Sequence, residues 1–342
     1  MLIPFIIPFI IGIFLAINMG GSGIGPSFSA AYGSGIIRRA AVPGLFGLMV
    51  FLGAILGGET TAKTVGKGIL NPEFMTYTVV SIILLSVAIS LLLANLLGIP
   101  QSTSQATVLA VVAPAYYFQE LNTVVLYTEI IPTWFVAPLA SFLIAFLVGK
   151  YIYKPIRKTG ITFSKRINNH PILNVLIILS SMYVAFSIGA NNVANAVGPI
   201  SSMAAIELEV QSEHSLHILI LSTLIIAPSF AIGASLFGKK ILQNTGKEIV
   251  LFGKIEAVII AVISASLMLA VSLVKGIPTS LVQLNVGAII GIGVAKLGFK
   301  NIFSKTSVNK FFVVWLIAPA IAFGLSYALM YLADVSGLLF YH

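Results

Sequence analysis

The sequence is dominated by apolar runs close to the length that a helix needs to cross a bilayer. They lie at about residues 1–18, 24–37, 42–58, 74–97, 102–118, 130–149, 172–189, 192–206, 218–237, 255–274, 279–297 and 311–333. Only 8% of the 342 residues are charged, whereas soluble globular proteins carry about 25%. We therefore predict an all-α polytopic membrane protein with about 10 to 12 transmembrane segments. This excludes soluble enzymes, extracellular scaffolds and nucleic-acid-binding proteins.

Short motifs recur in the same order in the two halves of the chain. Four pairs are separated by 169 to 181 residues: Gly20 and Gly189, Gly98-Ile99-Pro100 and Gly276-Ile277-Pro278, Gly66-Lys67 and Gly246-Lys247, and the two tryptophans Trp134 and Trp315. Gly and Pro are common in membrane helices, but four ordered coincidences indicate a duplication. We expect a first repeat at residues 1–149, a basic cytoplasmic linker at 150–170 and a second repeat at 171–342.

The charges between the apolar runs predict that the two repeats have opposite orientations. Arg38 and Arg39 follow the second run of the first half, whereas Glu207 and Glu209 follow the matching run of the second half. Under the positive-inside rule, the linker and the basic loops lie in the cytoplasm and both termini lie outside. This arrangement requires an odd number of crossings in each half. We expect the first two runs to share one crossing as a helix broken at a Gly-rich segment.

Inverted repeats with broken helices are typical of secondary transporters, which bind their substrate near the midplane. An opened helix turn exposes N–H groups that suit an anion. The first pair of expected breaks supplies the candidates Gly21, Ser22, Gly23, Asn191, Asn192 and Asn195. Amide side chains in an apolar run need partners or a wet cavity. The alternative is that these small and polar residues only hold helices together.

Hydroxyl and amide residues follow both Gly-Ile-Pro motifs and form a second group of candidates. They are Ser102, Thr103, Ser104 and Gln105 in the first half, and Thr279, Ser280 and Gln283 in the second. A proline stops one helix and a Ser or Thr caps the next. Capping explains one hydroxyl at each motif. The longer run in the first half favours a ligand role there.

Two of these segments resemble a known family. Residues 189–199 (GANNVANAVGP) and 98–105 (GIPQSTSQ) are similar to the two motifs of the inorganic phosphate transporter (PiT) family, and the likeness spans nearly the whole chain. The resemblance implies an inverted-repeat symporter for an inorganic oxyanion. It places Ser22, Asn191, Asn192 and Asn195 on anion and cation site positions, and residues 102–105 on the second-motif positions.

Departures from the family pattern indicate the substrate. Phosphate-transporting members carry an Asp in each copy of the first motif, where this chain has Gly23 and Asn192, and Pro26 replaces a motif Asn. The missing carboxylates remove an acceptor for the proton of hydrogen phosphate, whereas sulfate carries no proton at pH 7. The pattern is similar to the bacterial sulfate permease branch. It therefore favours sulfate import by alternating access, with phosphate symport as the alternative and an anion channel as a less favoured one.

The remaining expectations concern coupling and partners. The absence of the Asp pair favours H⁺ over Na⁺ as the co-transported ion, and no cofactor or bound metal is expected. Glu256 is either an interfacial residue or a proton acceptor, and Lys275 either attracts the oxyanion or anchors at the interface. A membrane-embedded enzyme is disfavoured because the chain has no cysteine and no histidine in an apolar run. The partners expected are the anion, the lipid of the cell membrane and a possible second copy in a homodimer.

Overall fold

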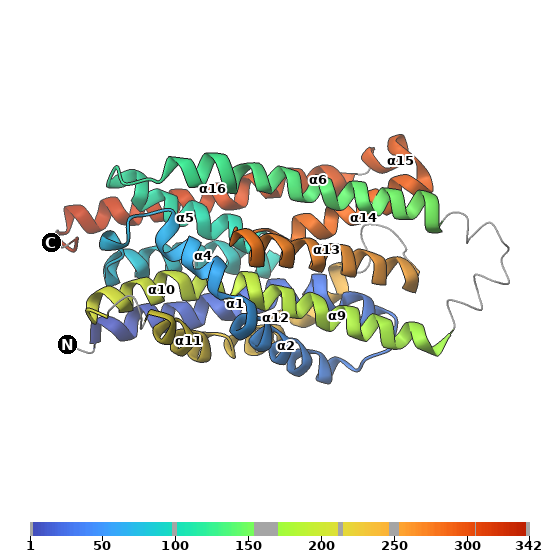
Figure 1. Cartoon of the computed structure of the whole chain (residues 1–342), viewed down its shortest axis with the longest axis horizontal. Helices are drawn as coiled ribbons and strands as arrows, with labels where there is room; N and C mark the ends of the chain where they lie inside the picture. Colours follow the sequence, from blue (N-terminus) through green and yellow to red (C-terminus); the bar gives the residue numbers. More distant parts are fainter. Residues whose placement is uncertain are drawn as a thin grey trace.

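The computed structural model describes residues 3–97, 101–153, 170–210, 215–245, 253–304 and 306–339, which are nearly all helical (Figure 1). Within these ranges, eight helical segments are long and apolar enough to span a bilayer. The main helices of the first half are α1 (Ile3–Gly33), α2 (Val42–Gly57), α3 (Glu59–Lys63), α4 (Tyr77–Leu97), α5 (Thr103–Tyr117) and α6 (Ile131–Leu147). Those of the second half are α9 (Pro171–Asn192), α10 (Ala194–Glu207), α11 (Ser215–Ile226), α12 (Ser229–Thr245), α13 (Lys254–Lys275), α14 (Leu281–Leu297), α15 (Phe299–Phe303) and α16 (Thr306–Val335). The prediction of an all-α polytopic membrane protein is confirmed.

Short helices of other types join or extend the main ones. Three are π-helical, namely η2 (Thr64–Gly68), η4 (Val125–Ile130) and η5 (Val148–Tyr153), and two are 3₁₀, namely η1 (Arg39–Ala41) and η3 (Pro72–Phe74). The turn η2 continues α2 and α3, so that these three pieces together make one crossing of the bundle. The turns η4 and η5 lengthen α6 at its two ends.

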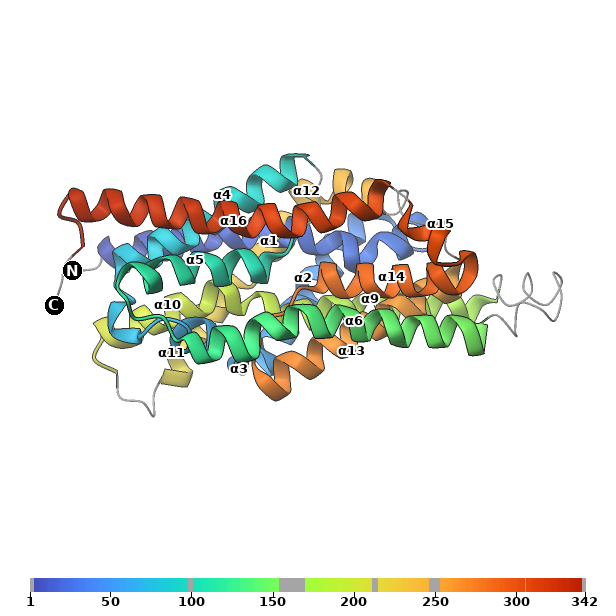
Figure 2. The ribbon, with the colours of Figure 1, turned by 90° about the horizontal axis from the view of Figure 1, so that it is seen from above.

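The first half crosses the bundle three times and adds one hairpin (Figures 1 and 2). We call the end where α1 begins and α16 ends the terminal end, and the opposite end the linker end. Helix α1 runs to the linker end, α2 with α3 and η2 returns, and α6 crosses again. Between them α4 enters from the terminal end to about the middle of the bundle, and α5 runs back. The odd number of crossings agrees with the sequence, but the hairpin was not expected.

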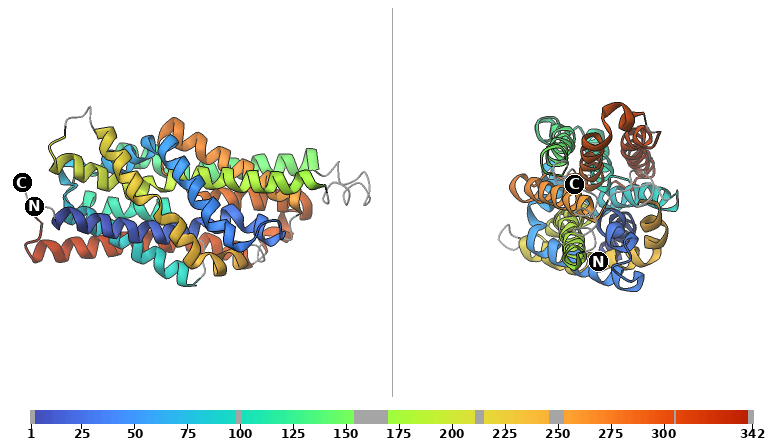
Figure 3. Two further views of the ribbon diagram at one scale, coloured as in Figure 1. Left: turned by 90° about the horizontal axis from the view of Figure 1, so that it is seen from below. Right: turned by 90° about the vertical axis from the view of Figure 1, so that its right-hand side faces the viewer.

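The second half repeats this path with the opposite direction. Helices α9 and α10 form one crossing toward the terminal end, α11 and α12 run back, and α16 crosses last. The hairpin of α13 and α14 enters from the linker end, so that its tip meets the tip of the first hairpin near the middle (Figure 3). The two halves also interlock, because α5 packs on α16 and α14 packs on α6. The inverted arrangement of the two halves is confirmed.

Glycines at two equivalent crossings let helices of opposite halves pack closely. A Cβ on Gly20 of α1 would overlap the Phe230 carbonyl of α12, and one on Gly233 would overlap the Ile17 carbonyl. Likewise, a Cβ on Gly53 of α2 would overlap the Phe186 carbonyl of α9. Gly189 faces the Val50 carbonyl in the same way. Small residues at such crossings permit close backbone approach in membranes.

The prediction of a helix broken at the first Gly-rich segment is wrong. The first two apolar runs do share one crossing, but α1 is helical without interruption from Ile3 to Gly33. In the second half only Val193 separates α9 from α10, and its φ of −61° and ψ of −34° are helical. The glycines are used for packing against α12, and this contact supports a continuous helix. The chain interruptions lie instead at the tips of the two hairpins.

The proposed division at residues 149 and 171 stays a prediction, as does the placement of both termini outside. Most of the linker, residues 154–169, lies outside the described residues, as do the motif Gly98-Ile99-Pro100 and Lys247. In the described part, α6 with η5 ends and α9 begins at the linker end, which is where the predicted linker would join them. The side chains of Lys254, Lys296 and Lys300 belong to helix ends on this same side of the bundle.

Candidate functional site

The hairpin tips bring two helix N-termini to the middle of the bundle. Helix α5 starts after Ser102, whose hydroxyl accepts a hydrogen bond from the Gln105 N–H at 3.2 Å. Helix α14 starts after Ser280, whose hydroxyl accepts from the Gln283 N–H at 3.3 Å. Capping therefore accounts for these two serines. The N–H groups of the first turns have no partner within their helices, and both helix dipoles present positive charge here.

A small, narrow cavity lies between these N-termini. Its lining comes from α1, α9 and both hairpin tips: Ser22, Gly23, Pro26, Gln101, Ser102, Thr103, Ile188, Asn192, Ser280, Leu281 and Val282. The polar lining residues are almost fully buried, at 2 to 6% exposed. The two inverted halves thus both contribute residues to one polar cavity near the middle of the bundle. An anion there would meet helix N-termini and neutral side chains.

Asn191 ties the second hairpin to the first. Its amide lies 3.0 Å from the Ser104 hydroxyl of α5 and 2.6 Å from the Ser272 hydroxyl of α13. With the amide turned so that its nitrogen faces Ser104, it also donates to the Thr279 carbonyl at 2.9 Å and accepts from the Thr279 N–H. This orientation satisfies more groups, because the Ser104 hydroxyl can then donate to the Thr279 carbonyl at 3.1 Å. We adopt it, and Asn191 is then fully hydrogen-bonded.

Asn192 and Thr103 face the cavity with unused donors. Within the described part of the chain, no hydrogen-bond acceptor lies at the Asn192 amide nitrogen or the Thr103 hydroxyl. The Asn192 oxygen accepts from the turned Asn191 amide at 3.1 Å, which directs the Asn192 nitrogen away from it. Asn191 therefore orients Asn192, and Asn192 is available to a ligand.

Two glutamines link the hairpins next to the cavity. The Gln283 amide nitrogen donates to the Gln105 side-chain oxygen at 2.9 Å. The Gln283 side-chain oxygen is buried and accepts no hydrogen bond from the described residues. The same holds for the Asn195 oxygen, although the Asn195 nitrogen donates to the Ser104 hydroxyl at 3.3 Å. Buried oxygens without donors are costly and could accept a cation.

The structure brings most of the sequence-derived candidates together. Six line the cavity: Ser22, Gly23, Ser102, Thr103, Asn192 and Ser280. Six more belong to the adjoining hydrogen-bond network: Ser104, Gln105, Asn191, Asn195, Thr279 and Gln283. Gly21 is the exception, because a Cβ there would meet the Phe237 side chain of α12 at 2.7 Å. For this glycine the packing interpretation holds.

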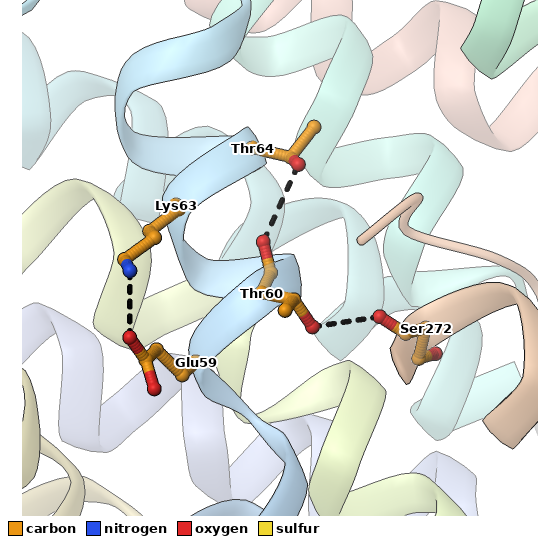
Figure 4. A network of polar contacts seen from close by, with 5 residues as sticks. All are labelled: Glu59, Thr60, Lys63, Thr64 and Ser272. Atoms are coloured by element: carbon orange, nitrogen blue, oxygen red, sulfur yellow. Dashed lines mark hydrogen bonds and ion pairs between the residues drawn. The ribbon is translucent and has the colours of Figure 1, made fainter. Parts of the chain in front are cut away.

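Several polar residues at the site were not among the candidates. Gln101 lines the cavity and donates to the Ser90 hydroxyl at 2.9 Å. Its position directly before the Ser-Thr-Ser run could have identified it as a candidate. The Trp134 indole donates to the Pro278 carbonyl at 3.0 Å and holds the second tip. Thr60 of α3 donates to the Ser272 carbonyl at 2.7 Å (Figure 4). No sequence pattern connects Thr60 with Ser272, 212 residues away.

Glu256 and Lys275 lie away from the cavity lining. Glu256 is 1% exposed and forms an ion pair with Lys296, which joins the two arms of the second hairpin. Nearby, Lys254 donates to the Asn174 side chain of α9 at 2.7 Å. Lys275 is exposed in the last turn of α13, where a cation interacts favourably with the helix dipole. The geometry at Glu256 favours a structural role over proton transfer.

No carboxylate lines the cavity among the residues described. In the same part of the chain there is no group of three or more His, Cys, Asp or Glu side chains that could hold a metal ion. The ligand environment consists of hydroxyls, amides and helix N-termini. It suits a fully ionised anion that needs hydrogen-bond donors.

Comparison with known proteins identifies the family. The sequence pattern described as the phosphate transporter family matches residues 19–173 and again residues 157–326. The chain belongs to the phosphate transporter family. It is thus a multi-pass membrane transporter of an inorganic anion, and the two matches fall on the two halves of the fold.

Relatives within the family differ in their substrates. The chain is 37% identical to the sulfate permease CysP of Bacillus subtilis over 321 residues, covering 93% of this chain and 85% of the relative. It is 25% identical to a Thermococcus kodakarensis protein provisionally named a phosphate permease, covering 93% and 94%. A solved structure, "The sodium-dependent phosphate transporter", superposes with a TM-score of 0.81 at 22% identity, covering 97% of this chain and 99% of that one. This last likeness shows the fold.

Proposed function

We propose that this transporter imports sulfate by alternating access, coupled to a co-transported cation. The observation that carries the proposal is the cavity between the N-termini of α5 and α14, whose described lining residues offer donors and include no carboxylate. Sulfate accepts hydrogen bonds and donates none at neutral pH. Hydrogen phosphate also carries a proton, which a carboxylate acceptor would stabilise, and the described lining of this cavity contains no carboxylate. The similarity to a sulfate permease supports the same substrate.

In the proposed mechanism, the anion exchanges its hydration shell for the donors of the cavity. The N–H groups at the starts of α5 and α14 and the Asn192 amide contact the oxyanion, while Ser22, Ser102, Thr103 and Ser280 complete the lining. The two hairpins enter from opposite ends of the bundle. Movement of one hairpin relative to the other would open the cavity to one side at a time.

The coupling ion is H⁺ or Na⁺. The buried oxygens of Asn195 and Gln283 offer neutral ligands for Na⁺, and a sodium-dependent transporter shares the fold. The missing Asp pair argues for H⁺. Uptake driven by a sodium gradient at constant pH, compared with uptake driven by a pH gradient without sodium, distinguishes the two ions.

The decisive experiment is uptake of radiolabelled sulfate into proteoliposomes with phosphate as competitor. We expect saturable sulfate uptake that excess phosphate inhibits weakly. Phosphate uptake without sulfate uptake would make the chain a phosphate symporter. Ion currents far above transporter turnover rates would indicate a channel instead.

A further inference from the structure

A second narrow cavity lies between α3 with η2 on one side and α10 with α11 on the other. Its lining is Ala62, Lys63, Lys67, Ser201, Ser202, Ser215, Leu216 and Leu219. It therefore combines two ammonium groups with three hydroxyl residues. None of these residues lines the central cavity.

The two lysines differ in their pairing. Lys63 forms an ion pair with Glu59 at 2.6 Å, on the side of α3 away from the Thr60–Ser272 contact (Figure 4). Lys67 follows one turn later, and no carboxylate lies within ion-pair distance of it in the described ranges. Two cations four residues apart on a helix repel each other. A bound anion would relieve this repulsion and give Lys67 a counter-ion.

The charge around this cavity is otherwise unfavourable for an anion. The terminal end of the bundle carries several acidic residues: Glu73, Glu120, Glu207, Glu209 and Asp334. An oxyanion that approaches from this end meets a negative surface. A local positive cleft can overcome such repulsion, because it focuses the field and raises the local anion concentration.

The second cavity adjoins the helix that carries the central amides. Ser202 and Asn195 both belong to α10 and are seven residues apart, which corresponds to about 10 Å along a helix. Packing here is close, since a Cβ on Gly66 of η2 would meet the Gly198 carbonyl and the Ser202 hydroxyl at 2.5 Å. Such π-helical turns are frequent at functional sites. An anion at Lys67 would thus lie about two helical turns from the central network.

We propose that the cavity lined by Lys63, Lys67, Ser201 and Ser202 is a second oxyanion site, which captures the transported anion at the terminal end before it reaches the central cavity. The inference rests on the proposed import of an inorganic oxyanion. Lys67 supplies the charge and the Ser202 hydroxyl supplies a donor, whereas the Ser201 hydroxyl donates to the Gly198 carbonyl at 3.0 Å. This second site lowers the sulfate concentration needed for half-maximal uptake. The central cavity determines the maximal transport rate.

The first test measures initial sulfate uptake against concentration in proteoliposomes. Removing the steering charge with Lys67→Gln should raise the half-saturating concentration about tenfold at low ionic strength, with the maximal rate unchanged. Lys67→Arg should stay close to the natural protein. The matched control Lys300→Gln removes an exposed lysine of α15 at the linker end and should change nothing. An unchanged half-saturating concentration in Lys67→Gln would overturn the proposal.

A second test needs no transport and keeps the two proposals separable. The chain contains no cysteine, so Ser201→Cys reports on this cavity alone. We expect a negatively charged methanethiosulfonate reagent to modify it faster than a positively charged one. Sulfate should slow the reaction with the negatively charged reagent. In the double variant Ser201→Cys, Lys67→Gln, the ratio of the rate with the negative reagent to the rate with the positive one should fall about tenfold. If neither Lys67→Gln nor sulfate changes the ratio of the two modification rates, the second site is refuted. If the natural protein takes up no oxyanion, only the proposed function is refuted.

Discussion

The Ser104 hydroxyl of α5 and the Asn191 amide of α9 lie 3.0 Å apart, although they are 87 residues apart and belong to opposite halves of the chain. Asn191 also contacts Ser272 and, through its turned amide, Thr279. One side chain thus holds both hairpin tips and orients the neighbouring Asn192. This relationship separates a positioning residue, Asn191, from a residue that faces the ligand, Asn192.

Replacing Asn192 should impair transport without unfolding the protein. Loss of a hydrogen bond to a charged ligand costs about 1.5–3 kcal/mol, so Asn192→Ala should lower sulfate uptake efficiency about tenfold or more. Asn191→Ala should abolish uptake and also lower thermal stability, because it leaves Ser104 and Ser272 without their shared partner. The control is Asn301→Ala on the exposed surface of α15. Normal uptake by both Asn191→Ala and Asn192→Ala would make these residues packing elements.

The glycines at the helix crossings should tolerate no side chain. Gly53→Ala and Gly189→Ala each force a methyl group into a backbone carbonyl of the facing helix. Such overpacking costs about 1–3 kcal/mol, and thermal unfolding in detergent should show the loss. Gly324→Ala in α16 is the matched control, because a Cβ there meets nothing within 4 Å. If all three variants unfold at the same temperature, the close packing of α2 against α9 at Gly53 and Gly189 is contradicted.

The Glu256–Lys296 pair should act as a structural link. Glu256→Gln removes the opposite charge beside Lys296, and breaking a buried pair typically costs about 3–5 kcal/mol. The double variant Glu256→Gln, Lys296→Met should recover stability and sulfate uptake. Thermal melts and uptake assays measure both. A stable double variant whose uptake no longer responds to a pH gradient would instead show that Glu256 takes part in proton coupling.

Tags in three loops test the orientation of the repeats. A tag at position 160 should be accessible from the cytoplasm, and tags at positions 124 and 212 should be accessible from outside. The path of the helices supports this result, because α5 and α10 both end at the terminal end (Figure 1). Labelling of positions 124 and 212 on opposite sides of the membrane would contradict the inverted arrangement.

The sequence by itself determined the membrane location, the duplication and the polar segments near the midplane. The membrane location and the polar segments follow from local properties, namely apolar runs, the charge signs between them and the cost of amides such as Asn191 in lipid. The duplication follows from motif pairs that recur in order, such as Trp134 and Trp315. The resemblance to the family pattern, which has Asp at the positions of Gly23 and Asn192, also supplied the expectation of sulfate as substrate. Such features are visible in a linear sequence because they depend on neighbouring residues or on motifs that recur in the same order.

Only the tertiary structure decided which segments cross, which return as hairpins and what each polar residue contacts. Gly20 and Gly189 suggested broken helices, yet close packing against α12 and α2 keeps α1 and α9 helical there. The contacts of Asn191 and the cleft at Lys67 join residues far apart in sequence. Such contacts depend on how helices of the two halves cross, and a glycine has the same sequence signature whether it opens a helix or lets another one approach.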